Sequence, residues 1–174
     1  MAVECILEIT DVKGESQVAG FEDQIDVLNW DWAMTQTGTA HLGSGSGAGR
    51  VSVQDMSIVK YVDSATHALM RACCNGKHFP KAKLTVRKSG GEPMPYLEIT
   101  MEQVMVTKVS TGVINVPVGG DEIDPSAALV NERQTENISL NFASVTVDYT
   151  PQSEKGSKAA KKTMKYDIAK NVAE

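Results

Sequence analysis

The chain has 174 residues, with 17 Lys and Arg against 22 Asp and Glu and a net charge of −5. This length suits one domain with a single core. A mildly acidic chain is a poor binder of nucleic-acid backbones, which call for a basic surface. No apolar run approaches the roughly 20 residues of a membrane-spanning helix, and the start, with Glu4 and Glu8 in its apolar stretch, is unlike a signal peptide. We expect one domain over 1–174, made in the cytoplasm without a cleaved leader, with no membrane insertion and no nucleic-acid partner.

The charge is unevenly distributed along the chain. Residues 152–174 contain six lysines against three acidic residues, so the rest of the chain is more acidic than the chain as a whole. Such asymmetry is typical of a basic tail that finds an acidic partner. A solvated terminal segment is the simpler interpretation, and both stay open.

Apolar and polar residues alternate with a period of two through most of the sequence, as in half-buried strands. In chain order the predicted strands are 3–10, 26–35, 51–61, 83–87, 97–106, 137–142, 145–149 and 164–168. The apolar phase switches between 142 and 145, and a bulge near Ala143–Ser144 would explain the switch. Eight or nine strands, each with one apolar and one polar face, predict an all-β sandwich or barrel.

The strand predicted over 26–35 places its two tryptophans on one face. Leu28, Trp30, Trp32 and Met34 alternate with a polar face that begins with Asn29 and Asp31. We expect the apolar face to be buried, with the tryptophans packed in the core rather than forming a binding cage.

One segment breaks the alternation. Residues 64–76 carry apolar side chains at helical spacing, with Asp63 or Ser64 available to cap the start and Asn75–Gly76 to end it. We predict a short helix at about 65–75, with Leu69 and Cys73 facing the barrel.

Two long loops are predicted, at about 36–50 and 112–133. Loops of this length in a compact domain are usually functional or disordered. The first has glycines at 43, 45, 47 and 49, a spacing that matches no phosphate-binding motif. It also leads into a strand, so no helix N-terminus is available to bind an anion. A flexible interaction arm is the better interpretation.

No catalytic or metal-binding constellation is apparent. The candidate ligands and nucleophiles are Cys5, Cys73, Cys74, His41, His67 and His78. An odd number of cysteines, two of them adjacent, is no disulfide framework and suits a reducing compartment. Metal-ligand spacing is absent, and Cys74 with His78 is the only local pair of nucleophile and base. We therefore expect no enzyme activity, no cofactor and no metal, with Cys73 packed in the core.

An ordered set of short motifs nevertheless resembles a known family. They are Ala2-Val3 through Leu7-x-Ile9-x-Asp11-Val12-Lys13-Gly14-Glu15-Ser16, Ile25-Asp26-Val27-Leu28, Trp30-x-Trp32, Gly47-Ala48-Gly49, Val53-Gln54-Asp55, Lys60-Tyr61, Gly76-Lys77-His78, Ala82 to Lys88, Thr135-Glu136-Asn137, Leu140-Asn141-Phe142-Ala143 and Val147-Asp148-Tyr149-x-Pro151-Gln152. Together they resemble the haemolysin-coregulated protein (Hcp) family, the tail-tube subunit of bacterial type VI secretion systems. The resemblance covers nearly the whole chain, and only the ordered set is specific.

The resemblance implies a compact two-sheet β-barrel with one short helix, similar to phage tail-tube proteins. It implies a homohexameric ring, with rings stacked into a tube that a contractile sheath expels together with a spike protein, into the extracellular medium or a target cell. The resemblance also implies that secreted effectors are bound and protected in the lumen. This chain departs from the family mainly at 112–133, where many members have a shorter turn, and in the basic 155–170 stretch.

Three further expectations join the resemblance to the residues. Asn29 and Asp31 should line the lumen, because their strand buries its opposite face. The glycine-rich loop should contact the next subunit through Gly38, His41, Leu42, Gly43, Gly45, Gly47 and Gly49. The acidic body and the basic terminal segment should complement each other between subunits. Two alternatives are a monomeric β-barrel that binds a small ligand in a closed apolar cavity, and an enzyme that depends on Cys74.

Overall fold

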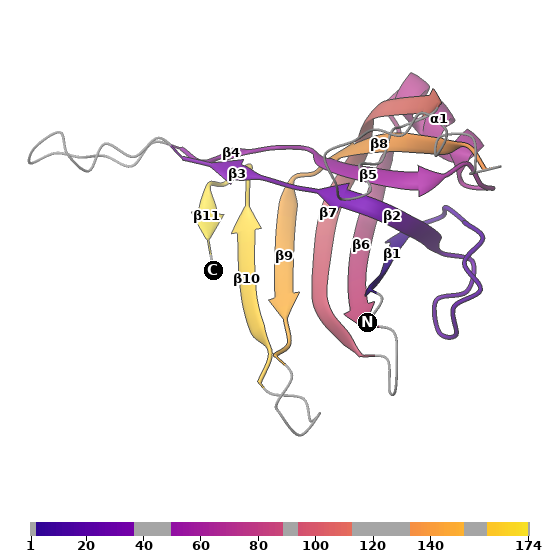
Figure 1. Cartoon of the computed structure of the whole chain (residues 1–174). Coiled ribbons are helices and arrows are strands. Elements are labelled where there is room, and N and C mark those ends of the chain that lie inside the picture. The colour runs from indigo at the N-terminus through magenta and orange to yellow at the C-terminus, as the bar shows by residue number, and fades with distance from the viewer. Residues whose placement is uncertain (1–2, 37–49, 89–93, 113–132, 152–159, 174) are drawn as a thin grey trace, which may run out of the picture.

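A computed structural model describes residues 3–36, 50–88, 94–112, 133–151 and 160–173 (Figure 1). The residues expected to form the subunit contact, from Gly38 to Gly49, lie outside these ranges, as does most of the predicted loop at 112–133. No helix in the described part of the chain is long and apolar enough to cross a membrane.

The predicted all-β fold with one helix is confirmed. The elements are β1 (Val3–Ile9), β2 (Ile25–Asp31), β3 (Met34–Thr35), β4 (Ser52–Val53), β5 (Met56–Tyr61), α1 (Thr66–Asn75), β6 (His78–Lys88), β7 (Pro95–Gly112), β8 (Thr135–Asn141), β9 (Ser144–Tyr149), β10 (Lys162–Asp167) and β11 (Val172–Ala173). The helix begins one residue later than expected, and the strand expected over 26–35 is divided into β2 and β3.

A closed barrel of six strands forms the body of the protein. One antiparallel sheet runs in the order β11-β10-β9-β7-β6-β1-β2-β5-β8, and an additional β7–β8 pairing closes it. The length of β7 makes this possible, because residues 97–102 pair with β9 whereas residues 105–112 pair with β8. β9, β10 and β11 therefore extend the sheet beyond the barrel (Figure 1).

The phase switch predicted near Ala143–Ser144 occurs, but in two strands at once. Asn141 pairs with Met105 and Ser144 pairs with Glu102, so both strands advance by the same number of residues across the break. Gln103 has a φ of 53°, in the left-handed region, and the Ala143 amide donates to the Glu102 carbonyl at 3.0 Å. A matched break, rather than a bulge in one strand, therefore redirects both chains from the closed barrel into the extended sheet.

Helix α1 packs on the barrel through Leu69 and Ala72, which are buried, while Cys73 is half-buried against the same core. Gly76 ends the helix in the left-handed conformation expected of it, with a φ of 66°. At the start, the Asp63 carboxylate accepts a hydrogen bond from the Ala65 amide at 2.9 Å. Asp63 therefore braces the turn that leads into the helix, but the N-cap residue is Ala65 and has no side-chain cap, so the prediction that Asp63 or Ser64 caps the helix is wrong.

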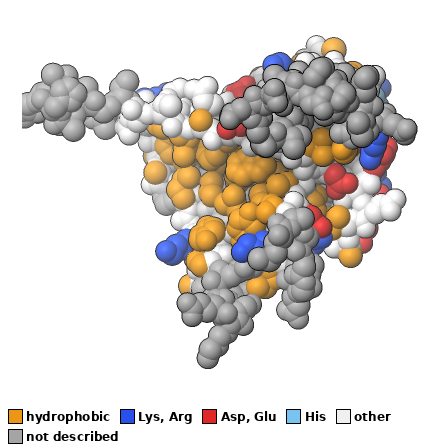
Figure 2. All heavy atoms as spheres, viewed as in Figure 1, with side chains coloured by type: hydrophobic (Ala, Val, Ile, Leu, Met, Phe, Trp, Pro, Cys, Tyr) orange, Lys and Arg blue, Asp and Glu red, His pale blue; other side chains and the backbone are white. Residues whose placement is uncertain are grey.

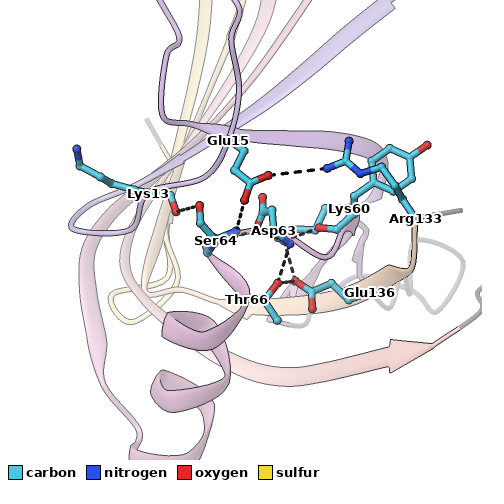
Figure 3. Close-up of polar contacts among 10 residues, drawn as sticks. Lys13, Glu15, Lys60, Asp63, Ser64, Thr66, Arg133 and Glu136 are labelled. Carbon is cyan, nitrogen blue, oxygen red and sulfur yellow. Dashed lines mark hydrogen bonds and ion pairs between the residues drawn. The ribbon is translucent and has the colours of Figure 1, made fainter.

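A buried ion cluster ties the start of the helix to the barrel (Figure 3). The Lys60 ammonium lies 2.7 Å from the carboxylates of both Asp63 and Glu136, and the side chains of Lys60 and Glu136 are fully buried. Thr66 donates to the same Glu136 carboxylate oxygen at 2.8 Å. Because three elements supply these groups, the cluster fixes α1 against β5 and β8.

Burial of the whole apolar face of residues 28–34 is a wrong prediction. Trp30 and Trp32 pack against the core as expected, but Leu28 and Met34 are 41% and 43% exposed. The pairing of β2 with β5 shifts register between Val27 and Asn29, so Leu28 is the extra residue. The bulge places Ile25, Val27 and Trp30 toward the core and turns Leu28 outward. The reason is that one inserted residue reverses which of the following side chains point to the core.

Candidate functional site: one polar and one apolar sheet face

The outer side of the barrel strands β2, β5, β8 and β7 carries mostly small polar residues. We call it the polar face, and its members are Asn29, Asp31, Ser57, Asn137, Ser139 and Lys108. Cross-strand pairing brings them together, because residues directly opposite each other point to the same side of a sheet. One such row runs from Asp31 through Ser57 and Ser139 to Lys108.

Side-chain hydrogen bonds tie the polar face together. The Asn137 amide donates to the Ser57 hydroxyl at 3.0 Å across the β5–β8 pair. Asn29 accepts from the backbone amide of Trp30 at 2.9 Å, which fixes its side chain at the exposed end of the face. On the opposite side of these strands, Ile58 and Ile138 are fully buried, so polar side chains here contribute nothing to the core.

The two residues predicted to line a lumen lie on this face, and both are exposed. Sequence reasoning missed Ser57, Ser139 and Lys108, which only strand pairing places beside Asp31. For Asn137 and Ser139 the sequence did contain a signal, because these residues alternate with the buried Ile138 and Leu140 on the predicted strand at 137–142.

The extended sheet presents the opposite character. Two rows of paired residues cross β1, β6, β7, β9 and β10 on the core side. The first row is Leu7, Leu84, Ile99, Val147 and Met164, and the second is Cys5, Val86, Leu97, Tyr149 and Lys162. We call Leu97, Val147, Tyr149 and Met164, which are half-buried or exposed, the apolar patch. Figure 2 shows the broad hydrophobic face to which these strands belong.

Burial falls along each row as it leaves the barrel. Leu84 and Ile99 are almost completely buried, Val147 and Met164 are half-buried, and Tyr149 is 47% exposed. The cause is the closure of the barrel by β8, which pairs with residues 105–112 of β7. Among the described residues, cover on β9 and β10 reaches Val145 and Tyr166, which are buried, but is incomplete at the far ends of these rows. The apolar patch is thus an open continuation of the core.

The hairpin of β3 and β4 flanks the glycine-rich segment. Met34 pairs with Val53 and Thr35 with Ser52, which agrees with the prediction that this loop joins two strands. Trp32 secures the base of the hairpin, since its indole nitrogen donates to the Gln54 carbonyl at 3.1 Å and its ring lies 6.0 Å from that of Phe142. In Figure 1 β3 and β4 lie above β10 and β11.

A polar cleft of about 820 Å³ lies on the other side of the molecule, between the β1–β2 connection and the end of β5. Four of its lining residues are acidic, namely Glu15, Asp23, Asp26 and Asp63, and Arg133 lies at its rim. The Arg133 guanidinium stacks 4.7 Å from the Tyr61 ring centroid and 3.9 Å from the Glu15 carboxylate. This acidic cleft differs from the closed apolar cavity that a small-ligand binding module requires.

No catalytic arrangement emerges around the cysteines within the described ranges. Burial raises the pKa of the Cys5 thiol, and a hydrogen bond with Trp30 only partly offsets it, so the reactive thiolate is disfavoured. Cys74 and His78 are exposed at the end of α1 and the start of β6. Among the described residues, no group of three histidine, cysteine or acidic side chains could hold a metal ion.

Comparisons with known proteins agree with this architecture. Residues 6–149 match the family model described as "Type VI secretion system effector, Hcp". The chain is 50% identical over 159 residues to protein hcp1 of Pseudomonas aeruginosa, an alignment that covers 91% of this chain and 90% of the relative.

Solved structures are similar as well. The Hcp1 structure from Salmonella typhimurium has a TM-score of 0.73 and 30% identity, with both chains fully covered. A structure described as a type six secretion system protein has a TM-score of 0.84 at 22% identity, covering 99% of this chain and all of the other, which supports the fold alone.

Proposed function

The chain belongs to the Hcp family of the type VI secretion system, and from this premise we propose that it works as a ring-forming structural subunit rather than as an enzyme. Copies of the chain assemble into a hexameric ring, and rings stack into a tube. The proposal follows the family and is supported by the two contrasting sheet faces of a single chain.

The apolar patch is the observation that carries self-assembly. Large contiguous apolar surfaces are uncommon on monomeric proteins and mark interaction sites. Here Val147, Tyr149 and Met164 continue the rows of the core itself. Another subunit that covered these rows would complete the second layer that β8 provides only over the barrel.

The glycine-rich segment fits the same role as an arm between subunits. Its flanking strands form the hairpin that leaves the barrel beyond Trp32. Residues 38–49 then contact the adjacent subunit, so that each copy contributes an arm to one neighbour and a surface to another.

The polar face suits a water-filled lumen. Its serine, asparagine and aspartate side chains present hydrogen-bonding groups without a strong net charge, and they do not support the core. In the assembled tube we place Asn29 and Asp31 at the lumen, where they contact secreted effectors. The spike protein and contractile sheath are the remaining partners, and the tube leaves the cell by type VI secretion.

One measurement tests the central claim. Native mass spectrometry of the purified chain, followed by negative-stain microscopy, should show six-copy particles and rings with a central opening. A chain that stays monomeric at all concentrations would overturn the ring and favour the alternative of a monomeric binding module.

A further inference from the structure

The β3–β4 hairpin is too short to hold a fixed direction by itself. It contains two residue pairs, Met34 with Val53 and Thr35 with Ser52. Isolated two-stranded hairpins are marginally stable in water. Three of these four residues, Met34, Thr35 and Ser52, are exposed, so little burial supports the hairpin. Contacts outside the hairpin must therefore determine where it points.

One group of contacts attaches the hairpin to the barrel. The Trp32 indole donates to the Gln54 carbonyl, and the Gln54 amide donates to the Ala33 carbonyl at 3.0 Å. Val51 and Val53 are half-buried and pack against the core. These contacts secure the residues on either side of the paired ones.

Arg50 joins the hairpin to the far end of the chain. It is the first described residue after the glycine-rich segment, and its Nη2 donates a hydrogen bond to the Ile168 carbonyl, 118 positions away. Figure 1 shows the turn between β10 and β11 directly below β3 and β4. A hydrogen bond from a charged donor is about twice as strong as one between neutral groups. The bond connects two elements that no strand pairing joins in the described part of the chain.

The turn that supplies this carbonyl is itself well fixed. The Asp167 carboxylate accepts a hydrogen bond from the Lys170 amide at 2.9 Å, which closes the turn. The Ile168 amide donates to the Ala143 carbonyl at 2.9 Å, so the same residue is tied to the matched break between β8 and β9. Ile168 also packs against the core. Its carbonyl is therefore a rigid acceptor for Arg50.

We propose that Arg50 is a positioning residue for assembly. By binding the Ile168 carbonyl, it holds the β3–β4 hairpin on the C-terminal turn and fixes the direction in which the hairpin carries residues 38–49. This inference rests on the proposed function, which assigns 38–49 to the contact with the adjacent subunit. A hairpin that is already held in one direction loses less conformational freedom on binding, which strengthens the contact.

Hydrogen exchange tests this link within a single chain. Arg50→Met keeps a long side chain but removes its donors. In dilute protein that native mass spectra show as single chains, the Gln54 amide should exchange about tenfold faster. The Ile168 amide should also exchange faster, because a coupling between two elements is reciprocal. Amides of β5 should exchange at the original rate. Unchanged exchange at Gln54, or equal acceleration in β5, would overturn the link.

A second variant reaches the hairpin from the C-terminal turn. Asp167→Ala removes the acceptor that closes the turn, and it lies on β10 rather than on the hairpin. It should accelerate exchange of the Gln54 amide as Arg50→Met does. The double variant should add little to either change, since both break the same link. Fully additive effects would contradict the link. Arg71→Met, at an exposed position on α1, is the matched control and should leave Gln54 exchange unchanged.

Ring formation is the functional readout. Arg50→Met, with folding confirmed by thermal unfolding, should need about tenfold more protein to form rings in native mass spectra, because the competent direction of the hairpin is less populated. Arg71→Met should assemble like the original chain. Faster exchange at Gln54 with unchanged ring formation would overturn the positioning role. Absence of rings in the original chain would instead overturn the proposed function, while exchange at Gln54 would still report on the link.

Discussion

Lys60 and Glu136 face each other at 2.7 Å with both side chains completely buried. The pair joins β5 to β8, and Asp63 and Thr66 extend it to the first turn of α1. One Glu136 oxygen, Oε2, is buried without a hydrogen-bond partner in the described structure. Charged groups this deep are retained only when they are paired, because removal from water is costly.

Removing one partner should therefore destabilise the fold strongly. Lys60→Met would leave two buried carboxylates facing each other, and we expect a loss of about 3–5 kcal/mol in the free energy of unfolding. Urea denaturation measures it. As a control, Lys13→Met removes an exposed partner of Asp23 and should cost no more than about 1 kcal/mol. Equal losses for the two variants would contradict a structural role for the cluster.

The apolar patch should matter to assembly more than to folding. Tyr149→Lys places a charge on a side chain that is 47% exposed in the single chain, so the thermal midpoint should change little. Covering that charge with another subunit would be unfavourable, and rings should be lost in native mass spectra. Met70→Lys, at an exposed position on α1, is the matched control and should keep rings. Rings that survive Tyr149→Lys would place the subunit contact elsewhere.

The glycine-rich segment should be required for rings as well. Deleting residues 43–49 shortens the segment between β3 and β4 without touching the paired residues Thr35 and Ser52. We expect light scattering to report monomers that unfold at the original temperature. Intact hexamers after the deletion would refute the contact assigned to 38–49.

A bulky residue on the polar face should affect cargo only. Asp31→Trp enlarges an exposed side chain at the end of β2, where packing of the core is not involved. Rings should form normally, and the amount of effector that copurifies should fall. Glu8→Trp, an exposed strand position outside the polar face, serves as the control. Unchanged copurification with Asp31→Trp would exclude this face from effector contact.

The Asp148 carboxylate should make stability fall in acid. Burial opposes its ionisation, but hydrogen bonds from Lys161 and Thr163 outweigh that effect and lower the pKa of Asp148 below its ordinary value. A lowered pKa in the folded state stabilises the fold above the unfolded pKa of about 3.9, and that contribution disappears as the pH drops through the folded pKa. Asp148→Asn should unfold at a lower temperature at pH 7 and lose less stability on acidification. Parallel pH profiles for the two proteins would contradict this.

Much of the fold was predictable from local pattern. Alternation with period two located the strands, and Gly76 marked the end of the only predicted helix, because a left-handed residue cannot continue it. The switch of phase near Ala143 was also visible. Its counterpart at Gln103 was not recognised, since a break in one strand is matched in the other only when the two strands are seen as partners.

The position of Leu28 shows where pattern reasoning failed. Its alternation with Asn29 is regular in the sequence, but one extra residue in the pairing with β5 turns it outward. Whether a strand contains such a residue depends on its neighbour, which lies about 30 residues away in the chain. No local signal specified it.

The sequence by itself determined the kind of protein: a single all-β domain with one helix, whose ordered motifs resemble the Hcp family. Only the tertiary structure decided which surfaces remain open. Closure of β8 on part of β7 buries Leu84 and Ile99 but leaves Val147 half-buried and Tyr149 exposed, although all four are apolar residues on strands. The hydrophobicity of a side chain determines that it favours burial. The pairing of distant strands determines whether other parts of the same chain can cover that side chain.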